Sequence, residues 1–213
     1  TVLVLGIVEP QSSGLGGGAF ILVHDAKRDA LMSYDGRETA PAAAKPDRFL
    51  RDGKPMGFRD AVNSGLSVGV PGLVRGLELA HKAHGRLPWS SLFAPAIRIA
   101  RDGFTVSARL NGLLRWYGAA RFSPAARAHY FDASGNPRAV GHVLRNPELA
   151  ATLQRVADGG ADTFYSGPIA EAIVAAVSGA SPAGDMSRED IAGYGALQRP
   201  AVCIGYRQRR VCG

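Results

Sequence analysis

Two short apolar runs near the start of the chain alternate in the manner of β-strands. Ala19 to His24 and Ala30 to Tyr34 are apolar and partly β-branched, and the polar segment from Asp25 to Asp29 separates them. This pattern predicts a hairpin of two strands. The second strand would carry the charged segment 35–38 to its end.

Farther along, apolar positions recur every three or four residues, which is typical of helices. Proline, asparagine and serine stand where several of these segments begin, and glycine follows several of their ends, as helix caps require. Ser187 and Asp190 form a capping-box signature. The predicted helices are 71–84, 95–102, 106–117, 147–158, 168–177 and 187–194.

Three remaining stretches lack a helical period. Residues 42–59 are polar and rich in proline and glycine, which predicts a loop with a short helix near 46–50. Residues 123–145 predict an irregular surface segment, and residues 202–211 a hairpin that turns at Arg207-Gln208. Because no internal repeat or low-complexity linker is present, residues 1–213 are expected to form one domain, or part of one, without an internal boundary.

The two cysteines lie in the last of these hairpins. A two-residue turn at Arg207-Gln208 would place Cys203 opposite Cys212 at a non-hydrogen-bonded position, where side chains are closest and a disulfide can form. A bulge or a longer turn would break this register. We favour free, partly buried thiols, with the disulfide as the alternative.

Composition and charge narrow the function classes. The chain has 213 residues, of which 46% are hydrophobic and 20% charged, with a formal net charge of +7. The arginines are scattered except at 207–210, which argues against a nucleic-acid partner. No apolar run reaches membrane-spanning length, so no membrane segment is expected in these residues.

Three local patterns suggest chemistry that their context does not support. The glycine-rich loop from Ser12 to Gly18 lacks the strand–loop–helix order of a dinucleotide site, so close backbone packing explains it better and no cofactor is expected. Ser12 and Ser13 lie in no nucleophile elbow, and we interpret them as turn hydroxyls. His81 and His84 have no third ligand at suitable spacing, so no metal site is expected.

Arg37 is the one candidate binding residue. It follows the second predicted strand, where loops commonly carry function, and its guanidinium presents a planar fork of donors that matches a carboxylate. The alternative is a surface arginine paired with Asp35 or Glu38.

Several short sequence motifs, spread along the chain, together resemble a known family in both sequence and order. They are E-P-Q-S-S-G-L-G-G-G at 9–18, D-G-R-E-T-A-P at 35–41, V-G-V-P-G at 68–72, G-R-L-P-W at 85–89, P-A-I at 95–97, A-R-D-G-F at 100–104, R-N-P-E-L-A-A-T-L at 145–153 and D-I-A-G-Y at 190–194. Together they resemble the γ-glutamyltranspeptidase family over essentially the whole chain. The matched part is the N-terminal part of the family's large subunit.

The resemblance implies an α+β fold, the αββα sandwich of the N-terminal-nucleophile hydrolases, of which this chain would be a helix-rich part. It implies an enzyme that cleaves the γ-glutamyl amide of glutathione and related compounds through a γ-glutamyl-enzyme. The nucleophile would be the N-terminal threonine of a small subunit, released from the same precursor by self-cleavage. It also implies that Arg37 binds the substrate α-carboxylate, and that the protein is periplasmic or extracellular.

The Thr-Thr-His segment of the family's cleavage point does not occur in these residues, so no catalytic residue is expected here and the chain alone is expected to be inactive. Gln208 stands where the family usually has glycine, which leaves the local turn open. Two alternatives to a transpeptidase or hydrolase remain. One is a related cephalosporin (glutaryl) acylase, and the other is a non-catalytic fragment that binds a partner.

Overall fold

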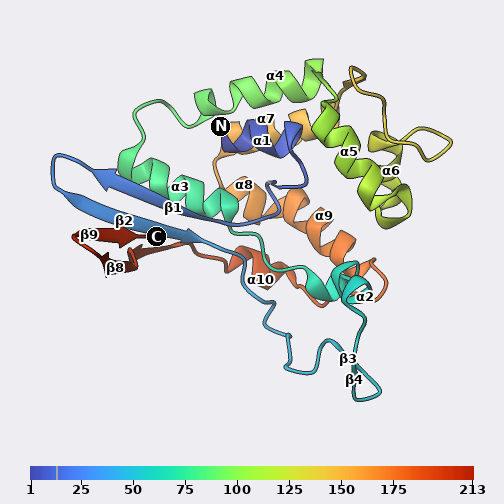
Figure 1. Ribbon diagram of the computed structural model, residues 1–213, viewed down its shortest axis with the longest axis horizontal. Helices are drawn as coiled ribbons and strands as arrows, with labels where there is room; N and C mark the ends of the chain where they lie inside the picture. The colour runs from blue at the N-terminus through green and yellow to red at the C-terminus, as the bar shows by residue number, and fades with distance from the viewer. Residues whose placement is uncertain (13) are drawn as a thin grey trace. The chain divides into compact units, whose positions relative to one another are not determined.

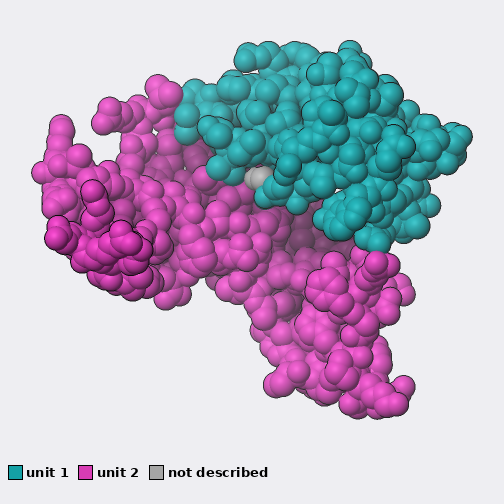
Figure 2. Space-filling view, in the orientation of Figure 1, with its two compact units in different colours: residues 1–14, 90–160 teal, residues 15–89, 161–213 magenta. Residues whose placement is uncertain are grey.

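The computed structural model describes residues 1–12 and 14–213, so the turn expected at Ser13 lies outside the described residues. The chain is rich in helix and contains four small antiparallel sheets within the described part (Figure 1). It divides into two compact units, coloured separately in Figure 2. Unit 1 comprises residues 1–14 and 90–160, and unit 2 comprises residues 15–89 and 161–213.

Unit 2 is built on a three-stranded antiparallel sheet in the order β1-β2-β7. Strands β1 (Ala19–Asp25) and β2 (Ala30–Gly36) form the predicted hairpin, and β7 (Leu197–Pro200) pairs with the other edge of β2. Helix α3 (Leu73–His84) packs against β1 and β2 (Figure 1). Exposure alternates along β1, as a strand with one covered face requires.

Unit 2 also contains two further hairpins and several short or medium helices. They are β3 (Leu50–Arg51), β4 (Lys54–Pro55), α2 (Phe58–Val62), η1 (Gly65–Ser67), α8 (Asp162–Tyr165), α9 (Gly167–Ser178), α10 (Arg188–Ala192), β8 (Cys203–Tyr206) and β9 (Arg209–Cys212). The capping box predicted for α10 is present, with Ser187 and Asp190 each bonded to the other's backbone N–H.

Unit 1 is mainly helical. Its elements are α1 (Val2–Val8), η2 (Ser90–Leu92), α4 (Ala94–Asp102), β5 (Phe104–Thr105), α5 (Ala108–Tyr117), η3 (Ala119–Arg121), α6 (Pro124–Tyr130), β6 (Val143–Leu144) and α7 (Pro147–Gly159). The side chain of Asn146 accepts a hydrogen bond from the Leu149 N–H at 2.9 Å, so the N-terminal cap predicted for α7 is confirmed. A buried apolar cluster joins α5 to its neighbours: Val106, Leu110, Leu114, Phe131 and Leu144.

Two expectations about local structure were wrong. The segment predicted as a helix near 46–50 forms turns and then the β3–β4 hairpin, because Asp52 and Gly53 both adopt positive φ and make a tight turn. The segment 123–145, expected to be irregular, contains helix α6. Ser123 caps this helix, whose seven residues are too few to show a clear apolar period.

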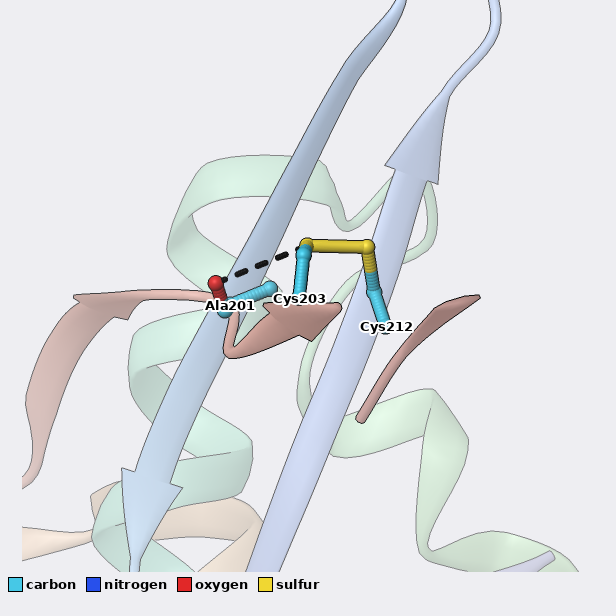
Figure 3. Close-up of a disulfide and its surroundings, with 3 residues drawn as sticks. All are labelled: Ala201, Cys203 and Cys212. Atoms are coloured by element: carbon cyan, nitrogen blue, oxygen red, sulfur yellow. Dashed lines mark hydrogen bonds between the residues drawn. A yellow bond between two sulfur atoms is a disulfide. The ribbon is translucent and has the colours of Figure 1, made fainter. Parts of the chain in front are cut away.

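The cysteine hairpin follows the predicted register, but the preference for free thiols was wrong. Cys203 pairs with Cys212 and Tyr206 with Arg209, and the two cysteines form a disulfide (Figure 3). Val202 and Gly213 exchange both backbone hydrogen bonds, so the cysteine pair beside them is a non-hydrogen-bonded pair, with Cα atoms 4.1 Å apart. No bulge displaces the register.

The turn itself explains why glutamine is tolerated there. Arg207 has a positive φ of 56°, whereas Gln208 does not, which is the sign pattern of a type II′ turn. Only the first central position of such a turn favours glycine. Gln208 therefore leaves the two-residue turn intact.

A thiol count tests the disulfide. Denatured under non-reducing conditions, the protein should show no titratable thiol, because the hairpin holds both sulfur atoms in one bond. Reduction before denaturation should raise the count to two and serves as the control. Two thiols in the unreduced sample would contradict the pairing.

Candidate functional site

Arg37 lies directly after the last residue of β2, at the end of the central strand of the sheet. Its side chain is 52% exposed, and a terminal nitrogen lies 3.2 Å from Oε2 of Glu38. The alternative pairing with Glu38 is therefore present. A pair this exposed contributes about 0–1 kcal/mol, so an incoming anion can displace Glu38 from the guanidinium at little cost.

Close backbone packing fixes the place where β2 ends. The Gly17 carbonyl accepts hydrogen bonds from the Gly72 and Leu73 N–H groups at 3.1 and 2.9 Å, and so caps the start of α3. A Cβ atom on Gly18 would lie 2.6 Å from the Gly36 carbonyl oxygen, and one on Gly36 would lie 2.9 Å from the Gly72 carbonyl oxygen. The packing role expected for the glycine-rich loop therefore holds for Gly17 and Gly18, whereas a Cβ atom on Gly14 or Gly16 would meet open space.

Both backbone polar groups of Arg37 are bonded to side chains. Its N–H donates to Oδ1 of Asp35 at 3.0 Å, and its carbonyl accepts from the Tyr194 hydroxyl at 2.7 Å. Oδ2 of Asp35 is in turn bonded by Nε of Arg199 at 2.7 Å. The alternative pairing of the Arg37 guanidinium with Asp35 is not what the structure shows, because that carboxylate binds the backbone and Arg199.

Sequence reasoning missed Tyr194 and Arg199. Tyr194 ends the motif D-I-A-G-Y, which was noted only as a mark of the family, and Arg199 lies in strand β7, which was not predicted. No local spacing signals a contact between residues 157 and 164 positions apart. The motif was the only available signal.

The ring of Tyr165 packs against the ring of Tyr194. The two rings stack with centroids 5.8 Å apart and an interplanar angle of 11°. The buried Tyr165 hydroxyl donates to the Pro71 carbonyl at 2.9 Å and accepts from the Arg75 N–H at 3.2 Å. Burial raises the pKa of Tyr165, and burial followed by the charges of Asp35 and Glu38 raises the pKa of Tyr194.

The other candidate residues have separate partners. Nε2 of His81 lies 2.8 Å from the Leu87 carbonyl oxygen, whereas Nε2 of His84 lies 2.6 Å from the Tyr34 hydroxyl. The residues that the structure describes contain no group of three or more histidine, cysteine, aspartate or glutamate side chains placed to hold a metal ion. Among those same residues, none of the helices combines the length and apolar character needed to cross a membrane.

The arrangement suits recognition of a carboxylate. Arg37 offers a partly exposed fork of donors on a backbone that is held from both sides. Its chemistry is that of binding and orientation, since a guanidinium keeps its charge at neutral pH and does not exchange protons with a substrate.

The glycine packing predicts a large effect for Gly72→Ala. A Cβ atom there would lie 2.2 Å from the Tyr194 hydroxyl oxygen and 2.3 Å from the Gly36 carbonyl oxygen, although the φ of −116° suits any residue. We expect the free energy of unfolding to fall by about 1–3 kcal/mol in urea titrations. The control is Gly195→Ala, where the added Cβ meets open space and stability should be unchanged or slightly raised. Equal effects of the two substitutions would contradict the account.

Tyr165 predicts a loss of stability at alkaline pH. Its raised pKa means that, above pH 10, the unfolded chain releases the phenolic proton while the folded chain keeps it, so unfolding becomes easier. The free energy of unfolding should fall by up to about 1.4 kcal/mol per pH unit from this group. In urea titrations from pH 9 to 11, the free energy of unfolding should decline less steeply with pH for Tyr165→Phe than for wild type. Identical slopes would show that Tyr165 titrates alike in both states.

Comparison with known proteins bears on the identity of this site. The sequence matches the family described as Gamma-glutamyltranspeptidase over residues 1–213. It is 40% identical over 198 residues to a protein of Arthroderma benhamiae named "Glutathione hydrolase proenzyme", covering 92% of this chain and 32% of that one. The chain spans about a third of the length of the curated relatives it matches.

Solved structures extend the likeness to the fold. Helicobacter pylori gamma-glutamyltranspeptidase aligns with a TM-score of 0.91 at 29% identity, covering 99% of this chain and 60% of that chain. The cephalosporin acylase of Bacillus halodurans aligns with a TM-score of 0.78 at 26% identity, covering 99% and 39%. The expected fold class, a helix-rich part of an N-terminal-nucleophile α+β sandwich, is confirmed by these neighbours. By sequence and by fold, the chain belongs to the γ-glutamyltranspeptidase family.

Proposed function

We propose that the complete protein transfers or hydrolyses γ-glutamyl groups, and that Arg37 binds the α-carboxylate of the γ-glutamyl substrate. The observation that carries this proposal is the way in which Arg37 is held and exposed. It lies within the family's D-G-R-E-T-A-P motif, half-exposed at the end of β2, with both backbone polar groups bonded and only a weak ion pair on its guanidinium. Glutathione and related γ-glutamyl compounds present a carboxylate that such a fork can bind.

Arg37 would act by orientation. Two parallel hydrogen bonds to the α-carboxylate set the direction of the extended γ-glutamyl chain, which places the γ-carbonyl against the nucleophile. In this proposal the nucleophile is the N-terminal threonine of a small subunit cut from the same precursor, and its own amino group serves as base. Residues 1–213 would form part of a single large-subunit domain and bind substrate without performing the covalent step.

An uncovered face of the sheet supports a further subunit as partner. Phe20 is 62% exposed, Leu22 43% and Leu197 50%. Phe20 and Leu197 both pair with Asp35, and directly paired residues share one face of a sheet, opposite the face against which α3 packs. This face carries exposed apolar side chains around the Asp35–Arg199 pair and ends beside Arg37, which fits contact with the second sheet of a sandwich that the small subunit would supply.

We also infer an extracytoplasmic location. The disulfide between Cys203 and Cys212 supports it, because such bonds persist mainly in oxidising compartments.

Substrate selectivity in the complete protein tests the role of Arg37. Replacing Arg37 by alanine should lower kcat/KM for γ-glutamyl-p-nitroanilide roughly ten- to a hundredfold, since a charged hydrogen bond contributes about 1.5–3 kcal/mol. Arg37→Lys should lose less, because it keeps the charge but not the fork. The 4-aminobutyryl anilide, which lacks the α-carboxylate, should be nearly unaffected.

The control for this experiment is Arg28→Ala. Arg28 pairs with Asp25 in the turn at the other end of the β1–β2 hairpin. Its replacement should leave kcat/KM unchanged for both anilides. Equal losses of Arg37→Ala on the two anilides would remove Arg37 from the site. Self-cleavage should persist in every variant, since it requires no free substrate.

The same assay separates the acylase alternative, which the likeness to the Bacillus halodurans cephalosporin acylase keeps open. A glutaryl anilide retains the carboxylate but lacks the α-amino group. Higher kcat/KM for the γ-glutamyl than for the glutaryl anilide supports the transferase or hydrolase, and the reverse order supports an acylase.

A further inference from the structure

We propose that Tyr194 is a positioning residue for Arg37: its hydroxyl fixes the Arg37 carbonyl and thereby orients the guanidinium toward the substrate carboxylate. The inference rests on the proposed role of Arg37. Tyr194 does not need to touch the substrate, because its hydrogen bond goes to the Arg37 backbone.

The end of β2 makes this hydrogen bond important. The ladder that joins β2 to β7 runs from Met32 to Asp35 and stops before Arg37. The next contact of this kind is the bridge between Thr39 and Val70. Between these two points, the Arg37 N–H depends on Asp35 and the Arg37 carbonyl on Tyr194. Removing the hydroxyl frees the peptide group that follows Arg37 to rotate, and that rotation swings the long side chain.

Tyr194 is well placed to fix a neighbour because it is itself fixed. It is 8% exposed, and its ring stacks on Tyr165, which is 1% exposed. The guanidinium carbon of Arg75 lies over the Tyr165 ring, 4.6 Å from its centroid, as a cation–π contact. Arg75 is held in turn by Glu78 and Asp162 at 3.1 and 2.6 Å.

Helix α10 joins the segment of Arg37 at a second point. Oδ1 of Asp190 accepts the Ala42 N–H at 2.8 Å, and Oδ2 accepts the Ser187 N–H at 2.8 Å. These two hydrogen bonds lower the pKa of the Asp190 carboxyl, the Ala42 bond being the stronger cause, so the carboxylate remains an acceptor at neutral pH. The motif D-I-A-G-Y thus binds segment 37–42 at both ends, through Asp190 and Tyr194.

The Tyr194 hydroxyl is also closely surrounded by backbone atoms of Gly72 and Gly36. The Tyr194 oxygen occupies the position that a side chain on Gly72 would need, beside the Gly36 carbonyl. The raised pKa of Tyr194 keeps the hydroxyl protonated, and therefore a donor, beyond the ordinary range of tyrosine. A phenylalanine ring would keep the stacking on Tyr165 and remove only the donor.

The test is Tyr194→Phe in the complete protein, assayed with the γ-glutamyl and 4-aminobutyryl anilides. We expect kcat/KM to fall about three- to tenfold for the γ-glutamyl substrate, as for the loss of one neutral hydrogen bond, and less than twofold for the other. A misfolded fraction lowers both values equally, so the ratio of the two reports positioning rather than stability. Self-cleavage shows that the variant has folded.

The matched control is Tyr34→Phe. Tyr34 lies in β2, the strand that leads to Arg37, and the substitution removes a tyrosine hydroxyl that is bonded to His84. Its ratio of kcat/KM for the two substrates should equal that of wild type. The double variant Arg37→Ala with Tyr194→Phe should lose no more on the γ-glutamyl substrate than Arg37→Ala alone, because the two residues act through one contact.

The outcomes separate the two proposals. If Arg37→Ala is selective for the γ-glutamyl substrate but Tyr194→Phe leaves the ratio unchanged, the positioning role is wrong and the role of Arg37 stands. If Arg37→Ala is itself unselective, the proposed function of Arg37 fails, and the role of Tyr194 fails with it. Additive losses in the double variant would also overturn the positioning role.

Discussion

The close approach of three backbone segments is the constraint on which the candidate site depends. The end of β2 at Gly36, the loop at Gly18 and the start of α3 at Gly72 lie so near one another that any Cβ atom would collide with a carbonyl. Glycine is required at these positions because it has no Cβ atom. The packing sets the place of Arg37, the residue after Gly36, before any side chain of the site is considered.

Hydrogen bonds to the backbone then hold Arg37 more firmly than its ion pair does. The exposed contact with Glu38 contributes little, because water screens both charges and both side chains lose freedom in forming it. The bonds from Asp35 and Tyr194 act on less mobile groups. A fixed backbone with a weakly engaged guanidinium is the combination that a carboxylate-binding arginine needs, since the side chain is oriented yet free to change partner.

Much of the fold followed from local rules. The β1–β2 hairpin, the Asn146 cap, the Ser187–Asp190 capping box and the pairing of Cys203 with Cys212 were all predicted from neighbouring residues. Predictions failed where a local preference was misjudged. Asp52-Gly53 is a strong turn signal just after the residues 46–50 that were assigned to a short helix, and α6 is too short to show a period. The disulfide was judged wrongly because an intact register had been considered the less favoured case.

The sequence by itself determined the β1–β2 and β8–β9 hairpins, the longer helices and several of their caps, the family and the choice of Arg37, because each depends on residues close together or on motifs in a recognisable order. Only the tertiary structure decided what surrounds Arg37. Tyr194 and Arg199 reach this segment across 157 and 164 positions. Apolar periodicity shows which face of an element is buried, but it does not state which distant polar group meets which carbonyl. That choice is made when strand β7 and the residues that follow α10 come to lie beside the end of β2, and packing of this kind has no local signature.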